Sequence, residues 1–141
     1  MELIAFTLFV IKHTIADYLT QYNWMIRDKA TYGAFGGLAH SGWHGILTSL
    51  VVWHITALSF YAVSLSGVVD TVIHYHVDYV KSNVWKNKRY TPADQMYWVT
   101  HGIDQMCHLF TYIFIIWFII RPSKNKLVFH SVKYFIIIII T

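Results

Sequence analysis

The stretch DTVIHYHVD, residues 70–78, places Asp70, His74 and Asp78 four positions apart in a chain that is 56% hydrophobic and 13% charged. In an α-helix, residues four apart lie on one face, about one turn from each other. Carboxylate and imidazole groups presented in this way are typical metal ligands. The stretch therefore predicts a helix whose polar stripe binds a metal or carries protons.

The same spacing recurs in three other apolar segments of the chain, as His13 with Asp17, His40 with His44, and Asp104 with His108. Helical bundles build metal sites in their interior from such pairs on facing helices. We therefore expect the pairs to converge at a similar depth. The predicted metal ligands are His13, Asp17, His40, His44, His74, Asp78, Asp104 and His108.

The number of candidate donors exceeds the four that a tetrahedral zinc ion takes. We expect two divalent ions that share a carboxylate and activate a water molecule. The chain has a single glutamate, Glu2, and so lacks the Glu-x-x-His pairs of di-iron bundles. Zinc is favoured, with manganese or iron as alternatives. Asp17 or Asp70 is the expected general base.

The segments that carry these residues are long and apolar. Mean hydropathy is +0.44 and the chain has 141 residues, enough for one domain. About 20 apolar residues suffice for a helix to cross a bilayer. The sequence predicts a single integral-membrane domain, 1–141, that forms an all-α four-helix transmembrane bundle. The expected helices cover about 2–24, 38–62, 68–85 and 92–120, with a turn at 64–67 and a short apolar tail at 121–141.

The start of the last helix has a clear local signal. Thr91 can cap free backbone N–H groups, Pro92 suits the first helical position, and Asp94 complements the helix dipole. The single cysteine, Cys107, gives no disulfide or thiolate cluster and is interpreted as a packing residue.

The cost of burying charge makes the His/Asp pattern informative about function. One ionised group at the centre of a bilayer costs a few kcal/mol on insertion scales. A whole set of such groups needs compensation, which bound metal supplies because it takes deprotonated carboxylate and neutral imidazole. Pairing of the groups with one another, as in a proton relay, is the alternative.

The basic residues argue for membrane lipids as partners. The net charge of +4 would suit nucleic acid, but Lys and Arg gather at the ends of apolar segments, so no nucleic-acid partner is expected. One side of the predicted bundle has six basic residues and the other has four. The six are Arg27, Lys29, Lys81, Lys86, Lys88 and Arg89; the four are Arg121, Lys124, Lys126 and Lys133. The excess favours a cytoplasmic first side, with the site nearer that face.

The text around the candidate ligands reads His13-Thr-Ile-Ala-Asp17-Tyr-Leu-Thr-Gln21, Lys29, His40 and His44, His74-x-x-x-Asp78-x-x-Lys81, then Asp104-Gln105-x-x-His108. It resembles the small membrane proteins of domain-of-unknown-function family 3307 from bacteria and phages, which implies a bacterial inner-membrane location but no activity. The segment at 39–44 also resembles a His-rich part of membrane-bound metal-dependent hydrolases.

The first resemblance adds three residues to the site. These are Gln21, Gln105 and Lys81. Gln21 lies one turn past Asp17 and Gln105 adjoins Asp104, so we expect both to orient a ligand. Lys81 is expected to hold a phosphate or carboxylate of the substrate, and it equally fits a lysine whose ammonium reaches the membrane interface.

Three functions remain open on the sequence. The first is a metal-dependent hydrolase that activates water against a lipid-like or small-molecule substrate. The second is a metal-ion or proton transport protein, in which Asp70 and His101 would extend the ladder of ligands. The third is a non-enzymatic phage or host membrane factor with a structural metal. The sequence leaves the oligomeric state undetermined.

Overall fold

The computed structural model describes residues 2–122, which are helical apart from short connections. The elements are α1 (Glu2–Thr14), the π-helix η1 (Ile15–Leu19), α2 (Asn23–Asp28), α3 (Phe35–Ile55), α4 (Phe60–Lys88), α5 (Gln95–Ile115) and the π-helix η2 (Ile116–Ile120). The all-α class is therefore confirmed. Most of the predicted tail, 121–141, lies outside the described residues.

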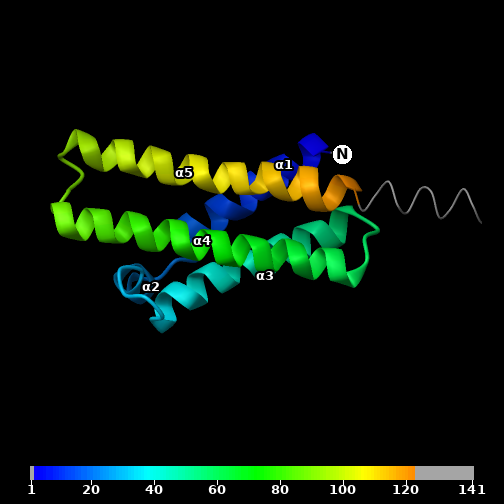
Figure 1. Cartoon of the computed structure of the whole chain (residues 1–141), viewed down its shortest axis with the longest axis horizontal. Helices are drawn as coiled ribbons and strands as arrows, with labels where there is room; N and C mark the ends of the chain where they lie inside the picture. Colours follow the sequence, from blue (N-terminus) through cyan, green and yellow to red (C-terminus); the bar gives the residue numbers. More distant parts are fainter. Residues whose placement is uncertain (1, 123–141) are drawn as a thin grey trace, which may run out of the picture.

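Four long rods form the bundle (Figure 1). Helix α4 packs against α3 on one side and against α5 on the other, while α1 contacts both α3 and α5. Short connections make α3, α4 and α5 successive antiparallel neighbours. The short helix α2 packs against α3 near the start of that helix. The N-terminal end of α1 lies beside the end of the α5–η2 rod.

The first predicted helix, 2–24, is wrong in its second half. It ends in the π turn η1, where the backbone N–H of Thr20 donates to the carbonyl of Ile15 over 3.1 Å. The chain then breaks and α2 follows as a separate element. A π turn inside a helix often marks a functional site, and η1 carries Asp17.

The predicted turn at 64–67 is also wrong, because those residues lie inside α4 and the real turn covers 56–59. The Ser66 hydroxyl is satisfied within the helix by the carbonyl of Ala62 over 2.9 Å. Gly67 faces Gly45 of α3, and a Cβ on Gly67 would lie 2.6 Å from the Gly45 carbonyl oxygen. These small residues therefore let two helices approach closely and do not break the chain.

The start of α5 lies three residues later than the sequence predicts. The helix begins at Gln95, with Asp94 as its N-cap residue. The backbone N–H and the hydroxyl of Thr91 both donate to the Asp94 carboxylate, at 2.7 and 2.9 Å. These two donors lower the pKa of the Asp94 carboxyl and close the turn that precedes the helix.

The interior of the bundle has an apolar part and a polar part. The apolar core comprises Ala5, Phe9, Val52, Leu58, Ala62, Val63, Tyr112, Ile115, Ile116, Ile119 and Ile120. The polar part holds three lysines, five histidines and four aspartates from α1, η1, α3, α4 and α5, with Lys29 in the connection after α2. Many large apolar side chains face outward, among them Leu3, Ile46, Trp53 and Phe118.

Among the described helices, one is long and apolar enough to cross a membrane by length and composition, the 26-residue stretch Gln95–Ile120. By length and composition, the described helices therefore do not establish the four membrane spans that the sequence predicts.

Candidate metal centre

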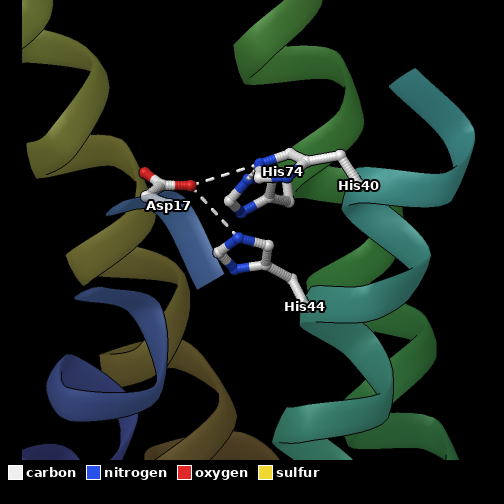
Figure 2. A group of neighbouring side chains, drawn as sticks. All are labelled: Asp17, His40, His44 and His74. Carbon is white, nitrogen blue, oxygen red and sulfur yellow. Dashed lines mark hydrogen bonds and ion pairs between the residues drawn. The ribbon is translucent and has the colours of Figure 1, made fainter. Parts of the chain in front are cut away.

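Asp17 stands at the centre of a group of imidazole rings. Its Oδ1 atom lies 3.2 Å from Nε2 of His40 and 3.2 Å from Nε2 of His44, two residues one turn apart on α3. Figure 2 shows Asp17 reaching from η1 toward both rings. On its other side, the Oδ2 atom lies 3.2 Å from Nε2 of His13.

His74 of α4 completes this first group. Its Nε2 atom lies 3.2 Å from Nε2 of His40, so one of the two nitrogens must carry a proton or both must face a shared cation. One donor atom each from Asp17, His40, His44 and His74 lies within 4.8 Å of all the others. Bonds of 2.0–2.1 Å in a tetrahedral zinc site separate the ligand atoms by about 3.3 Å. The donor spacing therefore fits one zinc-sized ion.

A second group shares His74 with the first and adds Asp78 and His108. Asp78 Oδ2 lies 3.3 Å from His74 Nε2, and Asp78 Oδ1 lies 3.8 Å from His108 Nε2. The rings of His44, His74 and His108 form a stack with centroid separations of 3.6 and 4.0 Å. However, Asp78 Oδ2 already pairs with Lys29 over 2.7 Å, so any ion here competes with a lysine.

Three buried or partly buried lysines neutralise three of the aspartates. Lys12 pairs with Asp70 over 2.5 Å, Lys29 with Asp78 over 2.7 Å, and Lys81 with Asp104 over 2.7 Å. A buried carboxylate needs such a partner because loss of hydration is costly. Among the ion pairs of the described residues, Asp17 is paired with imidazoles alone. Of the four aspartates in the polar interior, Asp17 is therefore the one that a divalent cation can bind without displacing a lysine.

Among the described residues, four histidines keep a buried ring nitrogen without a hydrogen bond. These atoms are the Nδ1 atoms of His40, His74, His101 and His108, together with the Nε2 atom of His108. An Nε2-bound metal leaves Nδ1 protonated, and such a proton normally finds an acceptor. His13 does have a partner there, the hydroxyl of Tyr112 at 2.8 Å.

The model of the family described as "Protein of unknown function (DUF3307)" matches residues 5–137. The chain belongs to this family. The resemblance drawn from the sequence is thereby confirmed. No curated protein and no solved structure matches the chain, so the likeness of residues 39–44 to metal-dependent hydrolases gains no support.

Not every predicted site residue of this DUF3307 member lies in the two ligand groups. Asp70 is 1% exposed and accepts from Lys12 and from the Thr48 hydroxyl, each over 2.5 Å. It belongs to neither group and forms a buried ion pair, and its role as a general base stays a prediction. His13 and Asp104 belong to neither group, but His13 contacts Asp17 of the first group and Asp104 contacts His108 of the second.

The two glutamines act differently from one another. Gln105 connects His13 with Asp104, since its Oε1 lies 3.1 Å from His13 Nε2 and its Nε2 donates to Asp104 over 3.1 Å. This is the predicted position beside the ligands. Gln21 instead accepts from Lys29 over 2.5 Å and makes no hydrogen bond to Asp17. It acts on the site through the lysine that holds Asp78.

The sequence reasoning missed Lys12 and Tyr112. Lys12 stands alone in the first apolar segment, and an ionisable residue in such a place is itself a sign of a buried partner. Tyr112 gives no comparable signal, because aromatic residues abound in this chain. Its hydroxyl affects the site only through its contact with His13, and that contact is visible only in the tertiary structure.

The charge count behind the predicted orientation also changes. Lys29 is 8% exposed and the Lys81 side chain is 15% exposed, and both pair with aspartates inside the bundle. Neither acts as a charge that flanks a membrane span. Removing these two from the first side leaves four basic residues against four, so the count no longer favours either orientation in this DUF3307 chain.

A cavity of about 340 Å³ opens beside the first group. Its lining includes Asp17, Gln21, Lys29, Lys81 and His101. The lining also contains Trp85 and Tyr97, whose rings stack with centroids 4.2 Å apart. The candidate metal centre of this family member therefore adjoins space in which a small polar group can approach Asp17.

Proposed function

We propose that this protein is an integral-membrane metal-dependent hydrolase with one firmly held divalent ion, most simply zinc, at Asp17, His40, His44 and His74. The observation that carries the proposal is the convergence of these four donors, from η1, α3 and α4, within 4.8 Å of one another. Nitrogen and oxygen donors at this spacing suit zinc, while manganese and iron remain compatible with the same donor set.

One ion is favoured over two because of the lysines. The second group depends on Asp78, which Lys29 already neutralises over 2.7 Å, and it shares His74 with the first. A second divalent ion would have to displace the ammonium group. We therefore assign the firm site to Asp17 and a weaker one to His74, Asp78 and His108.

The distribution of polarity supports a membrane location for all four rods. Polar side chains point inward and large apolar ones point outward along α1, α3, α4 and α5. Inward histidines lower the mean hydropathy of α3, and inward aspartates, His74 and Lys81 lower that of α4. Helix α1 has only 13 residues, so length and composition together single out Gln95–Ile120 among the described helices. At 1.5 Å per residue, the 21 residues of α3 span about 31 Å, close to the hydrocarbon thickness of a bilayer.

The surroundings favour a reactive site over a transport path. A path needs polar groups from surface to surface, but the polar chain ends near Lys12, which lies 4.6 Å over the Tyr112 ring. Beyond it Phe9 packs against Tyr112 within the apolar core. At the other end the cavity reaches Asp17, which a purely structural metal would not need.

The chain's own residues would divide the work of hydrolysis. A bound divalent ion supplies Lewis acidity and lowers the pKa of water. Asp17 and the three imidazoles would hold the ion, and water that reaches Asp17 through the cavity would have to join them as a fifth ligand. His13 would fix the second Asp17 oxygen. Lys29 and Lys81, at the wall of the cavity, would neutralise negative charge on a substrate.

The test is metal analysis of the full-length protein purified in detergent. We expect about one zinc per chain in the wild type, less than a tenth of that in His40→Ala/His44→Ala, and an unchanged content in His54→Ala. His54 is the control because it lies on the same helix but is exposed. Asp17→Asn, a nearly isosteric change, tests the same site if the double variant folds poorly. Wild type without metal, or equal content in Asp17→Asn, would overturn the proposal.

Activity is measured on p-nitrophenyl phosphate and p-nitrophenyl acetate. We expect cleavage of at least one of them to fall to background after chelation and to return on addition of zinc. Cleavage that survives complete removal of metal would exclude a metal-dependent hydrolase.

A further inference from the structure

We propose that the substrate is a phosphate monoester of a long-chain alcohol, with its phosphate in the cavity beside Asp17 and its chain in an apolar groove between α4 and α5. The catalytic part of this inference rests on the proposed function. The binding part rests on the cavity, the groove and the lysine that lines both.

The cavity provides donors for a phosphate group. Lys29 and Lys81 line it from two different segments, and an ammonium group has three N–H donors. Lys81 uses one on Asp104 and lies 4.7 Å over the Trp85 ring. Lys29 uses two, on Asp78 and Gln21. Each lysine thus keeps a donor for an anion, and charge-assisted hydrogen bonds to phosphate are among the strong ones.

The charge of the polar interior also favours an anion once the ion is bound. Lys12, Lys29 and Lys81 contribute +3, and the four aspartates Asp17, Asp70, Asp78 and Asp104 contribute −4. With neutral imidazoles the sum is −1, and one divalent ion changes it to +1. An anionic headgroup would then enter an interior of opposite charge, which is favourable where water is scarce.

The groove provides the matching place for an alkyl chain. It has a volume of about 350 Å³ and is lined by Val77, Val80 and Val84 of α4 and by Ile103 and Cys107 of α5. Lys81 and Asp104 form its polar end, and Lys81 also lines the cavity. Lys81 is the lining residue that the groove and the cavity share, so a chain in the groove and a phosphate in the cavity would meet at its side chain. Val80 and Ile103 are exposed on the outer face of the bundle, where a lipid in the bilayer has access.

The reaction balances with water as the only co-reactant. A water oxygen forms a bond to phosphorus, and the bond between phosphorus and the alcohol oxygen breaks. One water proton goes to the departing alkoxide, so the products are the long-chain alcohol and inorganic phosphate. No oxidant or reductant is required.

Cys107 offers a direct probe of the groove because it is the only cysteine in the chain. The rate of maleimide labelling at Cys107 is measured by mass spectrometry on full-length protein in a non-ionic detergent. We expect dodecyl phosphate to slow labelling at least fivefold. Inorganic phosphate alone and dodecyltrimethylammonium, which has the same chain but the opposite charge, should change the rate less than twofold.

The control variants separate the headgroup from the chain. Lys81→Met/Asp104→Asn removes both members of the buried pair, which avoids an unpaired charge, and should weaken protection by dodecyl phosphate on the order of tenfold. His54→Ala should leave it unchanged. Protection by both amphiphiles alike, or protection that the double variant keeps, would overturn the inference.

The outcomes also separate this inference from the proposed function. Protection that depends on Lys81 in protein without metal would keep the binding site and refute the hydrolase. Metal at one ion per chain without protection by dodecyl phosphate would keep the metal centre and refute this substrate.

Discussion

Asp17 and Asp70 are both enclosed by the bundle, yet their surroundings differ in kind. Asp70 is held by an ammonium and a hydroxyl, Lys12 and Thr48, each over 2.5 Å. Asp17 is surrounded by the Nε2 atoms of three imidazoles at 3.2 Å. The Asp70 carboxylate is neutralised by a lysine of the same chain. The imidazoles around the Asp17 carboxylate can instead bind a cation from solution together with it.

This difference shows that one part of a polar interior can stabilise the fold while another part remains able to bind a metal. A lysine that neutralises a carboxylate supports the fold without any ligand, but it excludes a metal ion from that carboxylate. Imidazoles at slightly longer distances do the reverse, because neutral histidine binds metal and leaves the carboxylate charged. We expect the Asp70 region to carry stability and the Asp17 region to carry function, and three predictions test that division.

The largest effect is expected at the Lys12–Asp70 pair. Lys12→Met leaves the Asp70 carboxylate buried without its cation, which should lower the free energy of unfolding by about 3–5 kcal/mol. Lys12→Met/Asp70→Asn removes both charges and should recover at least half of that loss. Thermal unfolding in detergent, followed by circular dichroism, measures both. Equal instability of the single and double variants would show that packing of the lysine stem, and not the charge pair, is what matters.

A medium effect is expected on removing metal. A ligand present at 100 times its dissociation constant stabilises the folded state by about 2.7 kcal/mol, so a chelator should lower the Tm of the wild type. The same chelator should not change the Tm of Asp17→Asn, in which the central ligand is lost. Lys12→Met/Asp70→Asn should still respond, since its metal site is intact. If Asp17→Asn also responds, the metal lies elsewhere in the chain.

The same division explains what could be predicted from the sequence. Spacing within one helix placed His40 with His44, His74 with Asp78 and Asp104 with His108 on inward faces, because helical periodicity is a local property. The three lysine pairs join different segments, so no spacing along the chain reveals them. The resemblance supplied Lys29 and Lys81, and only the tertiary structure identifies their partners.

The errors in helix boundaries have equally physical causes. Ser64–Gly67 resembles a turn, but its small residues serve the close contact between α3 and α4 at Gly45 and Gly67. The actual turn, 56–59, contains neither glycine nor proline. The π turn that presents Asp17 has no sequence rule comparable to helical periodicity, so its effect on the direction of that side chain was not predictable.

The smallest effect is expected at Tyr112, which is two contacts away from the nearest proposed ligand, Asp17. Its hydroxyl lies 2.8 Å from His13 Nδ1, and His13 in turn fixes the second oxygen of Asp17. Tyr112→Phe keeps the ring that packs against Phe9 and removes only this contact. Partners bonded directly to a metal ligand contribute about 10- to 100-fold to metal affinity. Tyr112 acts only through His13, so we expect zinc binding to weaken by no more than about tenfold, measured by competition with a chromogenic chelator. Tyr61→Phe, on the exposed side of α4, is the matched control and should bind as the wild type does. An unchanged affinity in Tyr112→Phe would show that the Tyr112 hydroxyl is not needed to position His13 against Asp17.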